Sequence, residues 1–172
     1  MTIVLLAIVF VIVAIEVTIS FGYIVSMFRG APYVPSDAAS IARILDYADL
    51  KPGELAADLG SGDGRILVAI GKQGIAAHGY EIQLPLVLVS RRRIRKQKLE
   101  RLLTVYWKSF WRADFSVYDV VIIYGMYHIM AGLEEKISRE LKPGSRVITN
   151  FFSLPGWIPV RQEGRISLYV KQ

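Results

Sequence analysis

Three closely spaced glycines and two acidic residues mark the segment Asp58-Leu-Gly-Ser-Gly-Asp-Gly-Arg65 as a candidate ligand loop. The glycines allow a tight turn and a close approach of the backbone to a ligand. A helix is expected to follow the loop, and its N-terminus would offer unpaired N–H groups. A further acid, Glu81, stands at the expected end of the next strand, where a carboxylate accepts hydrogen bonds from ribose hydroxyls. The pattern therefore predicts a site for a nucleoside.

The glycine spacing and the loop acids narrow the choice of nucleoside. The order Gly-x-Gly-x-Gly differs from the Gly-x-Gly-x-x-Gly pattern that packs against a pyrophosphate. Asp58 and Asp63 would repel a pyrophosphate and would suit a ligand with an ammonium group and no phosphate. S-adenosylmethionine, which combines adenosine, a sulfonium and an amino acid end, fits this description. A glycine turn with only a structural role is the alternative.

Strand-like apolar runs alternate with helical patterns from residue 37 onward. Such alternation predicts an α/β domain built around a mostly parallel sheet, whose site opens where the strands end. Ser36 is the expected N-cap of the first helix of this domain. Helices are expected at 37–48, 64–73, 86–97 and 131–141, strands at 55–59, 76–82, 102–107, 117–124 and 146–152, and a hairpin within 157–170.

Several sequence blocks resemble a known family. The segment from Asp58 to Ile66 resembles motif I of class I methyltransferases. More closely, the chain from Pro32 onward is similar to the membrane-anchored lysine methyltransferases that modify the c-ring protein of ATP synthase and the adenine nucleotide translocase. This resemblance implies a Rossmann-like class I methyltransferase fold with helices on both faces of the sheet, preceded by one transmembrane helix. The blocks that carry it are Pro32-Tyr-Val-Pro35, Gly79-Tyr-Glu-Ile82, Leu133-Glu-Glu-Lys-Ile-Ser-Arg-Glu-Leu141 and Gly156-Trp-Ile-Pro159.

The loop and the resemblance together give a set of candidate cofactor-binding residues. Tyr33 enters through the family's pre-domain motif, and Ser109 occupies a position where the family usually has an acid. No metal is expected. The cofactor-binding residues are predicted to be Tyr33, Asp58, Gly60, Ser61, Gly62, Asp63, Gly64, Arg65, Glu81, Ile82 and Ser109.

Methyl transfer from a sulfonium is an in-line displacement that mainly requires alignment of the reacting atoms. A lysine acceptor must be a neutral amine to attack, so its pocket should exclude water. Aromatic side chains after the later strands are candidates for the wall of that pocket, with ordinary packing as the alternative for each. Tyr124-Gly-Met-Tyr127 replaces a segment in which the family often has proline. The candidate catalytic residues are Tyr124, Tyr127, Phe151 and Trp157.

The N-terminal segment from Ile3 to Ile24 is apolar apart from Glu16, and it is long enough to span roughly 30 Å of hydrocarbon. It has neither the basic start nor the Ala-x-Ala site typical of a cleaved signal peptide. We therefore expect a membrane anchor at 1–28, a linker with the pre-domain motif at 29–36, and a methyltransferase domain at 37–172. The positive charges that follow the anchor predict a cytoplasmic domain.

The composition excludes some chemistries and favours certain partners. The 172 residues include no cysteine and two histidines, so disulfides, thiolate zinc sites and cysteine nucleophiles are absent. The formal net charge is +6. The basic run from Arg91 to Arg101 would favour anionic lipid, at about 1 kcal/mol per basic residue near a membrane. Nucleic acid is disfavoured, since no aromatic–basic platform accompanies the run.

The leading functional prediction is N-methylation of lysine in a membrane-associated protein. One alternative is a methyltransferase for a small or lipid-soluble acceptor, such as a quinone or a phospholipid headgroup. A nicotinamide-dependent oxidoreductase is a second alternative, although the glycine spacing argues against it. A third is a non-catalytic membrane module that binds the cofactor without turnover.

Overall fold

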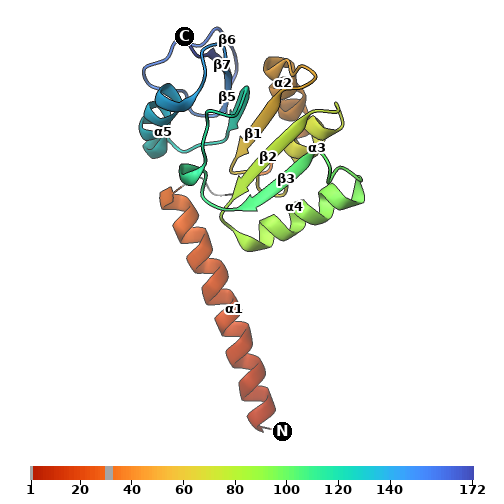
Figure 1. Ribbon diagram of the computed structural model, residues 1–172. Helices are drawn as coiled ribbons and strands as arrows, with labels where there is room; N and C mark the ends of the chain where they lie inside the picture. The colour runs from red at the N-terminus through yellow and green to blue at the C-terminus, as the bar shows by residue number, and fades with distance from the viewer. Residues whose placement is uncertain (1, 30–32) are drawn as a thin grey trace.

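The computed structural model describes residues 2–29 and 33–172. Within these residues, one seven-stranded sheet has the order β3-β2-β1-β4-β5-β7-β6 (Figure 1). The first five strands are parallel, and β7 runs antiparallel to both β5 and β6. The mostly parallel sheet of the prediction is therefore confirmed. The strands are β1 (Leu55–Leu59), β2 (Ala76–Glu81), β3 (Leu103–Trp107), β4 (Val120–Ile123), β5 (Arg146–Asn150), β6 (Arg161–Glu163) and β7 (Ile166–Val170).

Helices cover both faces of this sheet, as predicted. α2 (Ala38–Ala48), α3 (Arg65–Gly71) and α4 (Leu84–Lys96) contribute to the core on one face. α5 (Tyr127–Glu140) and the short 3-10 helix η1 (Phe110–Arg112) contribute to the core on the other. Side chains alternate between the two cores along each strand. In β1, for example, Ala56 packs into the first core and Ala57 into the second.

Some predicted element boundaries are wrong, for local reasons. The N-cap of α2 is Asp37 and not Ser36, because the Asp37 carboxylate accepts a hydrogen bond of 2.7 Å from the backbone N–H of Ser40. β4 begins three residues later than expected, because Tyr118 N donates to Phe115 O in a turn. α5 begins four residues earlier than expected, at Tyr127.

The N-terminal helix α1 (Thr2–Arg29) extends away from the sheet and its helices in Figure 1. Its side chains are described for residues 2–18 and 20 only, and all of these are exposed. Within the side chains that the structure describes, no helix is long and apolar enough to cross a membrane. Residues 1 and 30–32, including Pro32 of the pre-domain block, lie outside the described residues. The predicted domain boundaries remain predictions.

Candidate functional site

A pocket lies where the carboxyl ends of β1, β2 and β4 meet, as expected for a parallel α/β sheet. Its residues come from the segment before α2, the glycine loop, and the ends of β2, β3 and β4. The lining residues are Tyr33, Val34, Pro35, Ser36, Asp58, Leu59, Gly60, Ser61, Gly62, Asp63, Arg65, Ile66, Tyr80, Glu81, Ile82, Gln83, Lys108, Phe110 and Tyr124.

The glycine loop is held in place by β2 and covered by the segment before α2. Gly60 N and Ser61 N both donate to Tyr80 O, at 2.9 and 3.0 Å. Gly62 has a φ of +52°, and a Cβ there would lie 2.9 Å from Cε2 of Tyr33. Glycine at this position therefore allows both the left-handed turn and the close approach of the Tyr33 ring. The predicted place of Tyr33 beside the loop is confirmed.

Asp58 is the buried acid of the pocket. Its side chain lies at the end of β1, and its Oδ2 has no hydrogen-bond partner among the described residues. Burial raises the pKa of this carboxyl from 3.8 to about 7, and the charges of Glu81 and Asp63 act in the same direction. A buried carboxylate without a partner is unfavourable, so this position suits a cationic ligand group that would pair with it. Ser61 Oγ is likewise buried without a partner among the described residues.

Glu81 organises the turn at the end of β2. Its Oε2 accepts a hydrogen bond of 3.0 Å from Gly62 N, while Oε1 accepts from Ile82 N at 2.8 Å and Gln83 N at 2.7 Å. Burial raises the pKa of Glu81, and these three N–H groups oppose the rise. A carboxylate has about four lone-pair positions, so one remains for a hydroxyl in the pocket. The expectation that Glu81 binds a ribose is compatible with this geometry.

Asp63 has a different role from Asp58. It forms a two-point contact with Arg65, at 3.0 Å from Nε and 2.9 Å from Nη2, and an ion pair of 2.8 Å with Arg93 Nη1. Burial acts to raise the pKa of Asp63, but the hydrogen bonds from Arg65 and Tyr33 and the charge of Arg93 lower it to about 2. The prediction that both loop acids address an ammonium is therefore corrected, because two arginines already neutralise Asp63. Its role in orienting the loop is supported.

Arg65 also connects the loop to the segment that precedes α2. Its Nη1 donates a hydrogen bond of 2.8 Å to the carbonyl oxygen of Ser36. This bond holds the backbone of residues 33–36 across the pocket, where all four residues are lining. The same side chain therefore fixes both the loop acid Asp63 and the cover of the site.

Two predicted cofactor-binding residues lie outside the pocket lining. Gly64 caps α3 with a φ of +77°, and a Cβ there would overlap Ser90 Oγ on α4, so this glycine serves helix packing. Ser109 precedes η1 and does not line the pocket, whereas its neighbours Lys108 and Phe110 do. These neighbours, together with Gln83, were missed, although all three directly follow predicted strands.

The four candidate catalytic aromatics are not assembled as one wall. Tyr124 lines the pocket, and its ring centroid is 6.2 Å from that of Phe151, which is half exposed and has a φ of +91°. Tyr127 is 81% exposed at the start of α5. Trp157 lies in a separate hollow, where its Nε1 donates to Ser138 Oγ at 3.2 Å. Only Tyr124, with Phe151 beside it, has the expected placement.

Comparison with known proteins identifies similar chains. Residues 58–161 match the family model described as the ANTKMT methyltransferase domain. The human lysine N-methyltransferase that is named for the C-type subunit of ATP synthase is 38% identical over 128 residues, covering 74% of this chain and 54% of that protein. A protein-lysine N-methyltransferase of Saccharolobus islandicus is 31% identical over 130 residues, covering 74% of this chain and 81% of that protein. The mouse adenine nucleotide translocase lysine N-methyltransferase is 32% identical over 134 residues, covering 77% and 58%.

The chain thus spans little more than half the length of the human and mouse relatives. Among solved structures, an RNA methyltransferase from Salinibacter ruber, in complex with S-adenosyl-L-homocysteine, superposes with a TM-score of 0.75. It is 28% identical in sequence, and the match covers 80% of this chain and 92% of that one.

Proposed function

We propose that this chain, which belongs to the ANTKMT methyltransferase domain family, transfers a methyl group from S-adenosylmethionine to lysine side chains of proteins. The observation that carries the proposal is Asp58, a buried carboxylate without a partner among the described residues, in a pocket that also contains Glu81. Lysine as the acceptor is supported by the relatives, which are named as lysine methyltransferases.

Each chemical feature of the cofactor has a counterpart among the pocket residues. Asp58 would accept hydrogen bonds from the amino group, and the remaining lone pair of Glu81 would accept from a ribose hydroxyl. Phe110, just after β3, offers an apolar surface for the base. When bound, S-adenosylmethionine supplies an activated methyl group on a sulfonium. The contribution of the protein is therefore mainly to hold this group and the acceptor amine in line.

Tyr124 is the residue that we place beside the acceptor amine. It lies at the end of β4 on the pocket wall, and the Phe151 ring is tilted against it. An apolar aromatic surface lowers the pKa of an amine by excluding water, which favours the neutral form that attacks. No strong general base is needed for this displacement, because the leaving sulfur is already activated.

We further propose that the N-terminal segment attaches the domain to a membrane, with the domain on the cytoplasmic side. The segment from Ile3 to Ile24 has Glu16 as its only charge. Its described side chains are exposed, among them Ile3 at 83% and Phe10 at 74%. Such a continuous apolar surface is unfavourable in water and marks an interaction with lipid or protein.

Two fractionation experiments test the attachment. The full chain should resist extraction from membranes by alkaline carbonate, whereas a chain that begins at Tyr33 should be released. Release of the full chain would refute attachment. Digestion of the domain by protease added to the outer face of sealed cells would refute the cytoplasmic orientation.

The methyl-transfer proposal is tested with radiolabelled S-adenosylmethionine and native membranes. We expect label in a protease-sensitive band that yields methyl-lysine on acid hydrolysis. Asp58→Asn should lose this label, whereas the control Asp46→Asn should keep it, because Asp46 is exposed and pairs with Arg161 away from the pocket. Label that partitions into organic solvent or is removed by ribonuclease would refute a protein acceptor.

A further inference from the structure

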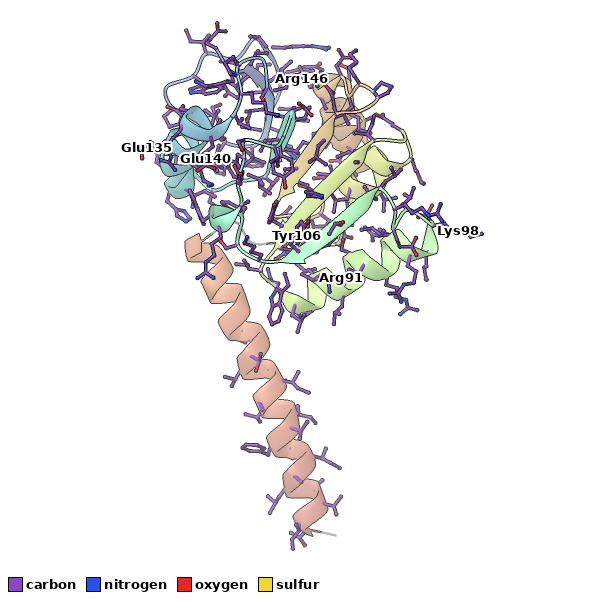
Figure 2. All side chains as sticks on the ribbon, viewed as in Figure 1. Arg91, Lys98, Tyr106, Glu135, Glu140 and Arg146 are labelled. Carbon is purple, nitrogen blue, oxygen red and sulfur yellow. The ribbon has the colours of Figure 1, made fainter. Side chains whose placement is uncertain are left out.

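The proposed activity leaves the basic run from Arg91 to Arg101 without a role. This segment contains seven basic residues and one acid, so it carries as much net charge as the whole chain. It covers the second half of α4 and the turn that follows. Figure 2 shows Arg91 alongside α4 and Lys98 pointing away from the domain, while Glu135 and Glu140 lie on α5 across the sheet.

The structure separates these basic residues into two groups. Arg93 binds Asp63 of the glycine loop, and Arg91 donates from Nε and Nη2 to Val105 O at 3.2 and 2.7 Å. These two arginines therefore have structural partners. Arg92, Arg95 and Lys96 are exposed, and the salt bridges found among the described residues do not include them.

The first half of α4 presents apolar side chains to solvent. Leu84, Leu88 and Val89 are 39%, 56% and 47% exposed. Trp107 is 60% exposed, and its indole N–H donates to Ile82 O beside the start of the helix. Positions 84, 88, 92 and 96 are one helical turn apart, so the apolar and basic residues form one continuous stripe. We call this stripe with its neighbours the α4 surface: Leu84, Leu88, Val89, Arg92, Arg95, Lys96 and Trp107.

We propose that the α4 surface lies on an anionic lipid bilayer. Exposed aliphatic residues and a tryptophan beside arginine and lysine are the combination found in helices at membrane interfaces. A nucleic-acid surface would instead need stacking rings between the cations, and the α4 surface has aliphatic side chains there. The charge complementarity with anionic headgroups supports the same occupant.

This contact would orient the catalytic pocket toward the membrane. In Figure 1 the N-terminus of α4 lies beside the carboxyl ends of β2 and β3, and Gln83, the N-cap of α4, lines the pocket. A domain that rests on the α4 surface therefore holds the pocket close to the headgroups. The inference rests on the proposed membrane attachment, and it adds a second contact that fixes the orientation of the domain.

The absence of cysteine from the chain allows a specific test. The full chain carries Leu88→Cys, labelled with a polarity-sensitive fluorophore, and is reconstituted in vesicles of phosphatidylcholine alone or of equal parts phosphatidylcholine and phosphatidylserine. We expect a blue shift of the emission in the anionic vesicles that decreases with added salt. The same label at Glu135→Cys, on the exposed side of α5, should show no shift.

Charge reversal at Arg92→Glu and Lys96→Glu should lower the ratio of bilayer-bound to free probe at least about tenfold. The control reversal at Lys72→Glu and Lys142→Glu, two exposed lysines outside α4, should leave it unchanged. A chain that floats with the vesicles but shows no shift at Leu88→Cys would refute the α4 contact while leaving the attachment intact. A chain that fails to float would refute both. A shift produced by single-stranded RNA and not by vesicles would assign the surface to nucleic acid.

Discussion

The substitution Asp58→Asn tests whether the pocket contains an uncompensated carboxylate. In the ligand-free protein the pKa of Asp58 is raised to about 7 by burial and by Glu81 and Asp63, from an ordinary value of 3.8. The folded state therefore binds a proton that the unfolded state has lost between these two pH values. Stability contributed by this group is fully present below about pH 4 and falls as the pH rises toward about 7.

The size of the effect follows from the separation of the two pKa values. Ionised Asp58 destabilises the folded state by about 4 kcal/mol at most at pH values above about 7. This is a large part of the roughly 5–15 kcal/mol that holds a domain together. Asparagine has the same shape and no charge. We therefore expect Asp58→Asn to be more stable than the natural chain at about pH 8 and equally stable at about pH 4.

Denaturant unfolding of both chains at several pH values measures this difference. Binding of S-adenosylhomocysteine gives an independent readout, because its amino group should pair with Asp58 and lower the pKa of that carboxyl. Calorimetry at about pH 6 in buffers of different ionisation enthalpy should show release of nearly one proton for the natural chain and none for Asp58→Asn. Equal stability of the two chains at high pH, or equal proton release, would refute the assignment of Asp58.

Three further substitutions test other parts of the site. Glu81→Gln should weaken S-adenosylhomocysteine binding by about tenfold in calorimetry, since one carboxylate acceptor is lost, and unchanged affinity would exclude Glu81 from the ribose site. Gly62→Ala should lower the free energy of unfolding by about 1–2 kcal/mol more than Gly74→Ala, because both have positive φ but only Gly62 faces the Tyr33 ring; equal losses would contradict this contact. Arg93→Ala should destabilise the domain by about 1.5–3 kcal/mol through the loss of its ion pair with Asp63, whereas Arg92→Ala, on the exposed side, should have little effect on unfolding.

The sequence predicted the central elements well, because their signals are local. β1 has the predicted bounds, since its apolar run ends at a glycine loop, and β2 differs by one residue. The start of α5 was missed because the exposed pair Tyr127 and His128 conceals a helical spacing that continues through Ile129, Met130 and Leu133. Local pattern also could not distinguish the turn before β4 from a longer strand, because Val117 and Tyr118 are as apolar as the strand itself.

The site was predicted where backbone geometry determines it and missed where distant side chains meet. Glycine spacing and one acid after β2 were enough to locate the loop and Glu81. The pairing of Asp63 with Arg93 joins a loop to a helix thirty residues away, and the basic run gave no sign of which arginine turns inward. Trp157 follows β5 in an irregular segment, so its place against Ser138 depends on a path that has no periodic signal.

The difference between the two loop acids explains how one short motif selects its ligand. Asp63 is surrounded by Arg65 and Arg93, so its charge is balanced before any ligand binds. Asp58 lies five residues earlier without such a partner among the described residues, and Glu81 adds a second negative charge nearby. A pyrophosphate in this pocket would face uncompensated carboxylate, which argues against a nicotinamide dinucleotide. A ligand with an ammonium group relieves the same unfavourable charge. The arginine pairing of Asp63 therefore confines the selection for a cationic group to Asp58, and it leaves the loop rigid enough to present that one carboxylate.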